Sequence, residues 1–364
     1  MKNASFEEIL MKILQLTSLR FFAATGVFMT HYNQHFLNSE NHILRFLSSF
    51  FSESYVWVCF FFVLSGFIIS YSQDGQNRDN AYRYLIKRAA RLFPVYIITM
   101  LFVWYYFSLA PGYKQTVTSL LLLQSWVPDP RFFWGFNAVA WSISVELFFY
   151  VAFLIVKGMS NRQVFIAFAL LISFNLTSHL NTFNSRDDLI WFYYINPINR
   201  LPDFLAGVLL FRMHKAGRLT VAMKNETIPE LSSVIILVTI IILAVSTNIP
   251  KSFRYDVLYI APCTLVIATF IKGSGKISKL LSNRILVSLG ESSFCLYMTH
   301  QFFIAILFTL IIKPGSIDDL CMFFFLLPII LFACVCLAHA VHHLIEKPAF
   351  RLITHRARHQ NIDN

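Results

Sequence analysis

Long apolar runs alternate with short polar segments along the whole chain. A transmembrane helix needs about 20 predominantly apolar residues to cross the hydrocarbon core of a bilayer. Runs close to that length lie near residues 16–36, 54–72, 92–110, 139–156, 164–180, 198–212, 231–247, 255–271, 294–312 and 320–344. The pattern predicts an all-α fold, a polytopic membrane bundle of about ten transmembrane helices.

The composition agrees with a membrane protein and excludes a soluble globular domain. Hydrophobic residues make up 57% of the 364 residues and charged residues only 13%, and the mean hydropathy is +0.60. No internal repeat and no long soluble insertion is visible in the sequence. We therefore expect one integral domain over residues 1–364, with a short basic tail from about residue 346.

The net charge of +11 does not indicate nucleic-acid binding, because the lysines and arginines stand in short clusters between apolar runs. Such clusters set membrane topology and favour the cytoplasmic side. The clusters are Arg78/Arg83/Lys87/Arg88/Arg91, Lys157/Arg162, Arg212/Lys215/Arg218/Lys224, Lys272/Lys276/Lys279/Arg284 and Lys347/Arg351/Arg356/Arg358. All of them can face the cytoplasm only if the short apolar segment 117–127 does not cross the membrane. Both termini are then predicted to be cytoplasmic.

The six cysteines all fall within apolar runs, without a CxxC motif. We therefore predict neither a disulfide framework nor a metal site. His339, His342 and His343 are an alternative set of haem or metal ligands, but no facing histidine set on another run accompanies them.

The run 16–36 carries two ionisable residues, Arg20 and His31. Such groups inside a membrane helix cost at least about 2–3 kcal/mol and usually face a protein-lined cavity or path. They stand eleven residues apart, which is about three helical turns and roughly 16 Å of rise, so they share one face at different depths. Alternatively, Arg20 snorkels to the inner surface and His31 to the outer one. The pair on one face favours function.

The fourth run contains a polar stripe that follows Trp141. Ser142, Glu146 and Tyr150 are spaced i, i+4 and i+8, so they share one helical face. A lone carboxylate in a membrane helix needs a cationic or hydrogen-bonding partner. Counted from the outer ends of their runs, His31 and Glu146 both lie roughly 8–10 Å deep, so we predict a His–carboxylate pair.

Arg88 and Arg91 lie on adjacent turns at the mouth of the third run, before Pro94 and Tyr96. Guanidinium pairs of this kind suit phosphate groups. The alternative, that they serve only topology and lipid headgroup contact, explains the same residues without a ligand.

Counting residues from the ends of the runs sorts the ionisable residues into two layers. Arg200 and Asp203 can pair with each other at i, i+3, and His300 is expected about 9 Å from the cytoplasmic face. The predicted inner layer consists of Arg20, Arg88, Arg91, His300 and Glu346. The predicted outer layer consists of His31, Glu146, Arg200 and Asp203. We expect a bound molecule to reach between the two layers.

Because they occur together and in the same order along the chain, these motifs resemble those of the acyltransferase-3 family of bacterial integral membrane acyltransferases. That family includes O-antigen, exopolysaccharide and Nod-factor O-acetylases. The motifs are Arg20 with His31, FFVLSGFII at 61–69, Arg88-x-x-Arg91 before Pro94 and Tyr96, WSISVELFFY at 141–150, Arg200 with Asp203, SSFCLYMTH at 292–300 and Glu346-Lys-Pro. The chain departs from the family at Thr17-Ser18, where an Asp-Gly pair is common, and at the single Glu146, where a double acid is common.

The resemblance implies transfer of an acyl group, most often acetyl, from cytoplasmic acyl-CoA to a hydroxyl of a lipid-linked or cell-surface polysaccharide. His31 would act as general base, Glu146 would orient it, and Ser142 offers a less favoured covalent route. The acyl-CoA-binding residues would be Arg20, Arg88, Arg91, Tyr96 and His300. The acceptor-binding or structural polar residues would be Trp141, Tyr150, Arg200, Asp203 and Glu346.

The same resemblance implies a bacterial inner-membrane protein that contacts membrane lipid, uses acyl-CoA as co-substrate without a bound cofactor, and acylates a carbohydrate. We expect none of the SGNH hydrolase-like domain that some family members carry at the C-terminus. A proton-coupled transporter or flippase that uses His31 and Glu146 as its proton site is the alternative, although no repeat halves are visible.

Overall fold

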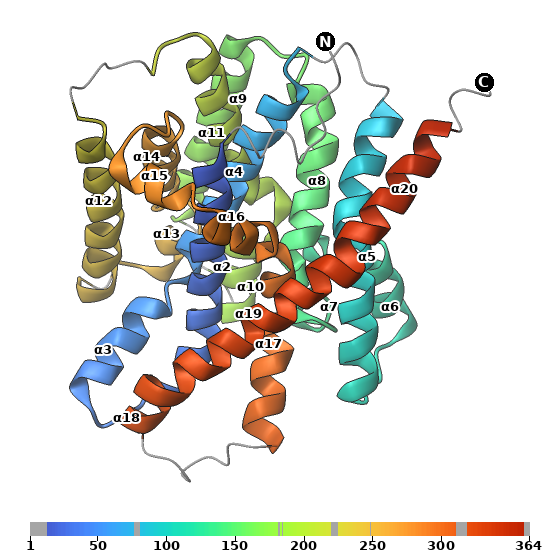
Figure 1. Ribbon diagram of the computed structural model, residues 1–364, viewed down its shortest axis with the longest axis vertical. Coiled ribbons are helices and arrows are strands. Elements are labelled where there is room, and N and C mark those ends of the chain that lie inside the picture. Colours follow the sequence, from blue (N-terminus) through green and yellow to red (C-terminus); the bar gives the residue numbers. More distant parts are fainter. Residues whose placement is uncertain are drawn as a thin grey trace.

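The computed structural model of the protein describes residues 13–75, 81–180, 183, 185–219, 225–247, 249–310 and 319–359 (Figure 1). Within these residues every regular element is a helix, which confirms the predicted all-α fold. Arg78 and Lys224 of the predicted basic clusters, and both ends of the chain, lie outside the described residues.

The longer helices form the body of the bundle, and shorter segments connect them. The longer ones are α2 Leu14–Asn33, α4 Ser54–Gln73, α5 Ala81–Tyr106, α8 Trp141–Val156, α9 Asn161–Ser178, α11 Pro197–Lys215, α12 Thr227–Ser246, α14 Ile260–Phe270, α17 Ser293–Leu310, α19 Leu327–Val341 and α20 Lys347–His359. The shorter ones are η1 Gln34–Phe36, α3 His42–Phe51, α6 Tyr113–Leu120, η2 Gln124–Trp126, α7 Pro130–Phe133, η3 Ala138–Ala140, α10 Arg186–Ile190, η4 Trp191–Ile195, α13 Lys251–Tyr255, α15 Lys276–Leu281, α16 Arg284–Glu291, α18 Asp319–Cys321, η5 Met322–Leu326 and η6 His342–Glu346.

Fewer helices are long and apolar enough to cross a membrane than the ten that we predicted. By length and composition, six stretches of the described chain can cross a membrane, or seven if the bent pair α16 and α17 counts as one. The predicted set also contains α2, α9 and α11, of which α2 carries Arg20 and His31, and α11 carries Arg200 and Asp203. The number ten and the cytoplasmic termini therefore stay predictions.

The segment that we predicted not to cross the membrane, 117–127, belongs to a run of short helices. Residues 113–140 contain the short helices α6, η2, α7 and η3. Of these, only η3 belongs to a candidate span, because it leads directly into α8. The backbone turns at Leu122, where φ is 53°, and Gln124, Ser125 and Phe133 are buried. This segment therefore folds back into the bundle before α8 begins.

Helices α4 and α11 pack so closely that the contact requires glycine. A Cβ atom on Gly207 would lie 1.9 Å from the carbonyl oxygen of Val63, and one on Gly66 would lie 2.0 Å from that of Phe204. Small residues let membrane helices approach in this way. The contact holds the first half of α11, with Arg200, against α4.

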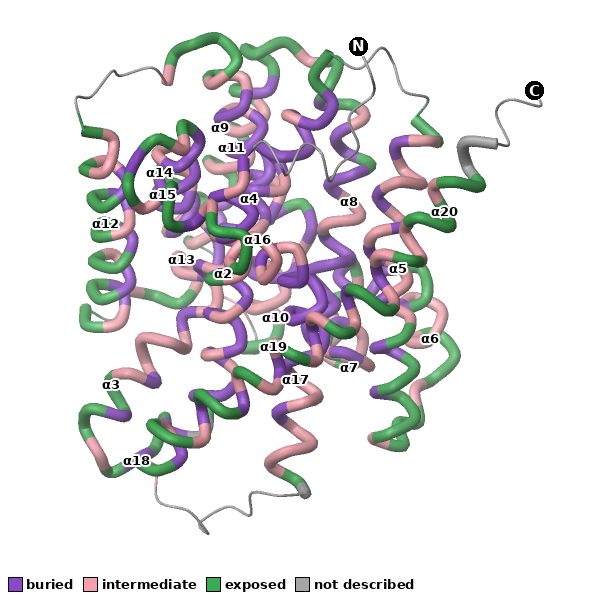
Figure 2. Tube along the Cα trace, viewed as in Figure 1, coloured by how far each residue is buried: buried purple, intermediate pink, exposed green. Residues whose placement is uncertain are grey.

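Helix α17 begins inside the bundle because the chain bends by 62° between α16 and α17. A Cβ atom on Gly290 would lie 2.1 Å from the carbonyl oxygen of Thr17, so α16 lies directly against α2. Ser292 and Ser293 at the bend are buried. Figure 2 shows that buried residues concentrate in the central helices, whereas exposed residues follow α12 and α20.

Candidate active site

Among the described residues, the bundle contains two cavities that many of the predicted residues line. The first, which we call the arginine cavity, has a volume of about 810 Å³ including its open mouth. Apolar side chains of α4, α5 and α8 form much of its wall. Its polar lining consists of Arg20, Ser65, Arg88, Arg91, Ser142, Glu146, Tyr150, Ser293 and Tyr297. The predicted stripe of Ser142, Glu146 and Tyr150 therefore does face one cavity.

Positive charge exceeds negative charge at the arginine cavity. Glu146 and Glu346 both stabilise the charge of Arg20, and Arg91 opposes it. Together with Arg88, three guanidinium groups thus stand against two carboxylates. An excess of guanidinium groups at a partly enclosed site favours an anionic ligand, and phosphate is the anion that guanidinium groups match in geometry.

Glu146 is held by hydroxyl groups. The Tyr150 hydroxyl donates a hydrogen bond of 2.5 Å to Oε1 of Glu146, and the Ser65 hydroxyl approaches the same oxygen at 3.5 Å. Ser65 precedes Gly66, so the close contact of α4 with α11 positions it. These contacts fix the carboxylate within the arginine cavity.

Arg88 is almost fully buried and has a defined orientation. Its Nη2 donates to the hydroxyl of Ser72 at 2.8 Å. Its guanidinium carbon lies 5.4 Å from the ring centroid of Tyr84 and 5.7 Å from that of Tyr150, within the range of cation–π attraction. A side chain held in this way is preorganised for a ligand.

Glu346 ends the π-helical turn η6, and two donors fix its carboxylate, one from α17 and one from η6 itself. The Sγ of Cys295 lies 3.1 Å from Oε2 of Glu346, and Nδ1 of His342 lies 2.8 Å from the same atom. Among the described residues, these three are a group whose ligand atoms lie close enough to hold a metal ion. However, Arg91 and Arg20 interact electrostatically with this group, and a nearby positive charge disfavours a cation.

The second cavity, which we call the histidine cavity, has a volume of about 1030 Å³ including its mouth. Its polar lining includes Thr30, His31, Gln34, Ser54, Arg186 and Gln301, and its aromatic lining consists of Tyr55, Trp134, Trp141, Tyr194, Tyr255 and Tyr297. Aromatic faces beside amide and imidazole groups suit a ligand with both apolar and hydroxyl-bearing surfaces.

His300 lies beside His31 in the structure, not at the depth of Arg20 as predicted. The centroids of the two imidazole rings are 5.1 Å apart. The predicted depth was wrong because it was counted from a membrane surface, whereas α17 starts after the bend inside the bundle. His300 therefore belongs with His31.

The predicted pair of His31 and Glu146 does not form. Glu146 lines the arginine cavity, whereas His31 lines the histidine cavity. The buried segment up to η3 precedes α8, so counting from the outer surface placed Glu146 too near that surface. Glu146 thus belongs to the inner group of charges.

Arg200 and Asp203 form the predicted ion pair, with Nη2 and Oδ2 2.5 Å apart and both side chains buried. Nη1 of Arg200 donates to the carbonyl oxygen of Tyr255, and its guanidinium carbon lies 6.0 Å from the ring centroid of Tyr194. Because Tyr194 and Tyr255 line the histidine cavity, the ion pair supports the wall of that cavity from behind.

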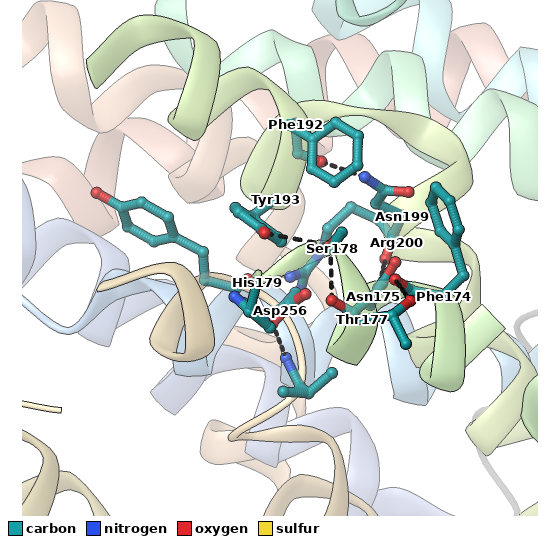
Figure 3. Close-up of polar contacts among 12 residues, drawn as sticks. Phe174, Asn175, Thr177, Ser178, His179, Phe192, Tyr193, Asn199, Arg200 and Asp256 are labelled. Atoms are coloured by element: carbon teal, nitrogen blue, oxygen red, sulfur yellow. Dashed lines mark hydrogen bonds and ion pairs between the residues drawn. The ribbon is translucent and has the colours of Figure 1, made fainter. Parts of the chain in front are cut away.

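Figure 3 shows a further buried pair beside Arg200 that we did not predict from the sequence. Nε2 of His179 lies 3.5 Å from Oδ1 of Asp256. The His179 ring stacks between Tyr193 and Phe253, with centroid distances of 4.4 and 3.8 Å. Neither His179 nor Asp256 lines the arginine cavity or the histidine cavity, so their contacts are those of a structural brace.

Of the other predicted residues, Trp141 lines one of these two cavities and Tyr96 lines neither. Trp141 lines the histidine cavity, whereas Tyr96 donates to the carbonyl oxygen of Ser119 at 2.7 Å and lines neither cavity. Sequence reasoning missed Tyr297, which, like Val58, lines both cavities. Its spacing of three residues before His300 was the available signal, because i and i+3 share a helical face.

Comparison with known proteins agrees with these features. A family model described as "Acyltransferase domain" matches residues 13–339. The chain is 27% identical over 312 residues to acyltransferase MdmB of Streptomyces mycarofaciens, a match that covers 79% of this chain and 78% of that protein.

It is also 24% identical over 321 residues to SACOL0978 of Staphylococcus aureus, which is provisionally named an O-acetyltransferase. That match covers 78% of this chain but only 49% of the staphylococcal protein, so the chain spans about half of that relative. SAS0844, from another strain of the same species, matches equally. A search of solved structures gave no significant match.

Proposed function

The chain belongs to the acyltransferase-3 family, and from this premise we propose that it moves an acetyl group from acyl-CoA to a carbohydrate hydroxyl. The donor binds from the cytoplasmic side. The acceptor is a lipid-linked or cell-surface polysaccharide such as O-antigen or exopolysaccharide, and the protein acts in the bacterial inner membrane. The observation that carries this proposal is the meeting of an arginine-lined cavity with a histidine-lined cavity.

The arginine cavity supports the assignment of the donor. Acyl-CoA carries phosphates at one end and a thioester at the other, so its phosphates would contact Arg88, Arg91 and Arg20 while its pantetheine arm occupies the apolar part. Each charge-assisted hydrogen bond to a guanidinium contributes about 1.5–3 kcal/mol. Glu146 and Glu346 oppose part of that positive charge, which keeps the arginines compatible with a buried site when no donor is bound.

The histidine cavity supports the assignment of the acceptor. A sugar ring presents an apolar face that packs on aromatic side chains and hydroxyl groups that bond to Gln34 and Gln301. His31 stands at this cavity as the general base that takes the proton of the attacking hydroxyl. His300 is its neighbour, so His300 takes the supporting role that we had assigned to Glu146.

Direct transfer is favoured over an acyl-serine intermediate. A serine nucleophile needs an adjacent base. The Ser142 hydroxyl contacts the carbonyl oxygen of Val139 at 2.9 Å and the hydroxyl of Tyr297 at 2.7 Å, and neither is a base at neutral pH.

The test is an assay of purified protein in lipid nanodiscs with acetyl-CoA labelled in the acetyl group. Release of free CoA should depend on added membrane glycan, and the label should appear on the glycan. A transporter or flippase would release no CoA under any of these conditions, and that result would overturn the proposal.

A further inference from the structure

Tyr297 stands at the junction of the two cavities. Its side chain lines both of them, as does that of Val58, which has no polar atom. Tyr297 is buried with 6% of its surface exposed, yet its hydroxyl has two partners, Oγ of Ser142 at 2.7 Å and the carbonyl oxygen of Val139 at 3.2 Å. A polar group therefore occupies the place where two bound substrates would meet.

Transfer of an acyl group creates a need for a hydrogen-bond donor at this place. When a hydroxyl attacks a thioester, negative charge develops on the carbonyl oxygen, and donors aimed at that oxygen stabilise the transition state. The thioester enters from the arginine cavity and the hydroxyl from the histidine cavity. The carbonyl oxygen must then lie near the junction.

We propose that the Tyr297 hydroxyl donates a hydrogen bond to this oxygen in the transition state and that Ser142 positions and polarises Tyr297. This inference rests on the proposed function. Ser142 has one proton to give, and Oγ lies within reach of the Tyr297 oxygen. When Tyr297 turns its proton to the oxyanion, Ser142 donates to Tyr297, and the chain of two hydrogen bonds strengthens the first.

The position of the histidines agrees with this assignment. Tyr297 and His300 lie one turn apart on α17, with ring centroids 6.0 Å apart, and the His300 ring lies 5.1 Å from that of His31. The donor to the carbonyl oxygen and the base for the attacking hydroxyl therefore flank one region. This is the arrangement that attack of a hydroxyl on a carbonyl carbon requires.

The step balances without another reactant. His31 takes the proton of the acceptor hydroxyl while the hydroxyl oxygen forms a bond to the carbonyl carbon of the thioester. Tyr297 stabilises the oxyanion that results. The carbon–sulfur bond then breaks, the carbonyl forms again, and the CoA thiolate takes the proton from His31. The products are an ester and free CoA.

The test compares Tyr297→Phe with the intact protein in the acetyl-CoA assay. The ring remains, so the wall is kept and only the hydroxyl is lost. We expect kcat to fall about 100-fold or more, the effect of losing one oxyanion donor, while KM for acetyl-CoA changes less than about threefold. Ser142→Ala should reduce kcat by a smaller factor, because Tyr297 keeps its own proton.

Tyr259→Phe is the matched control, because Tyr259 is also buried and its hydroxyl donates to Glu53 at 2.8 Å, but it lines neither cavity. It should transfer at the normal rate. Fluorotyrosine at position 297 gives an independent result. A more acidic phenol is a stronger hydrogen-bond donor, so kcat should rise with phenol acidity while KM stays the same.

If Tyr297→Phe keeps kcat within threefold, or changes only KM, the inference is wrong while the proposed function stands. If Tyr297→Phe is inactive because it misfolds, the fluorotyrosine series decides, and a kcat independent of phenol acidity overturns the inference. If the intact protein releases no CoA, the proposed function itself fails.

Discussion

The imidazole rings of His31 and His300 lie 5.1 Å apart although they come from opposite ends of the chain. Nδ1 of His300 lies 3.1 Å from the carbonyl oxygen of Leu296. A carbonyl only accepts hydrogen bonds, so Nδ1 carries the proton and Nε2 keeps its lone pair. Nε2 has no partner among the described residues. Nε2 of His300 is therefore available to accept a hydrogen bond from His31.

We predict that His31→Ala slows acyl transfer about a hundredfold or more while acetyl-CoA still binds, because the variant loses its general base. His300→Ala should reduce the rate less, since it removes only the neighbour that orients His31. Transfer kinetics and isothermal titration with a non-reactive acyl-CoA analogue measure the two effects separately. Near-normal transfer by His31→Ala together with an inactive His300→Ala would assign the base to His300 instead.

Arg88→Ala and Arg91→Ala should each raise KM for acetyl-CoA about 10-fold or more, with kcat largely restored at saturating donor. The reason is the loss of a charge-assisted contact to a phosphate. A thioester of dephospho-CoA identifies the contact: if one arginine holds the phosphate that this donor lacks, the variant should no longer distinguish the two donors. A loss of turnover with unchanged donor affinity would return both residues to a purely topological role.

Asp203→Asn should lower the free energy of unfolding by about 3–5 kcal/mol, because it leaves the buried Arg200 without its counter-charge. The matched control is Asp129→Asn, whose partner Arg131 has 76% of its side chain exposed. An exposed ion pair contributes at most about 1 kcal/mol, so that variant should melt like the intact protein. Thermal unfolding in detergent checks both, and equal melting temperatures for the two variants would show that the Arg200 pair is not a support.

Reporter tags placed after Gly158 and after Lys215 should both report the cytoplasm. The structure supports this prediction independently of the charges. Arg212 near the end of α11 donates to the carbonyl oxygen of Val156, the last residue of α8, and to that of Met159 in the turn that follows, both at 2.8 Å. The two ends therefore lie on the same side. A tag that reports the outside would reverse the orientation of the arginine cavity.

The sequence predicted correctly the features that depend on residues close together along one helix. The spacing of Arg200 and Asp203 at i, i+3 predicted a pair that the structure contains. The face shared by Ser142, Glu146 and Tyr150 followed in the same way from helical periodicity. Segment 117–127 was excluded as a span by the distribution of charge, and its short helices agree.

Depth in the membrane could not be predicted with the same rule. Counting residues assumes that a spanning helix starts at the surface and runs straight. That assumption fails for His300, because α17 follows a 62° bend, and for Glu146, because a buried irregular segment precedes α8. Both features depend on contacts distant in sequence, such as Gly290 against Thr17. The sequence therefore selected Arg20, Glu146 and His31, which the structure places at cavities, but it paired Glu146 with His31, which lines the other cavity.

The measurement that tests the central claim most directly is the mass of surface and lipid-linked glycans from cells that carry either the intact chain or His31→Ala at equal membrane abundance. The proposed function predicts glycan that is heavier by one acyl group in the cells with the intact chain, and unmodified glycan in the cells with His31→Ala. Identical glycan masses in the two cell lines, or an added acyl group in both, would contradict it.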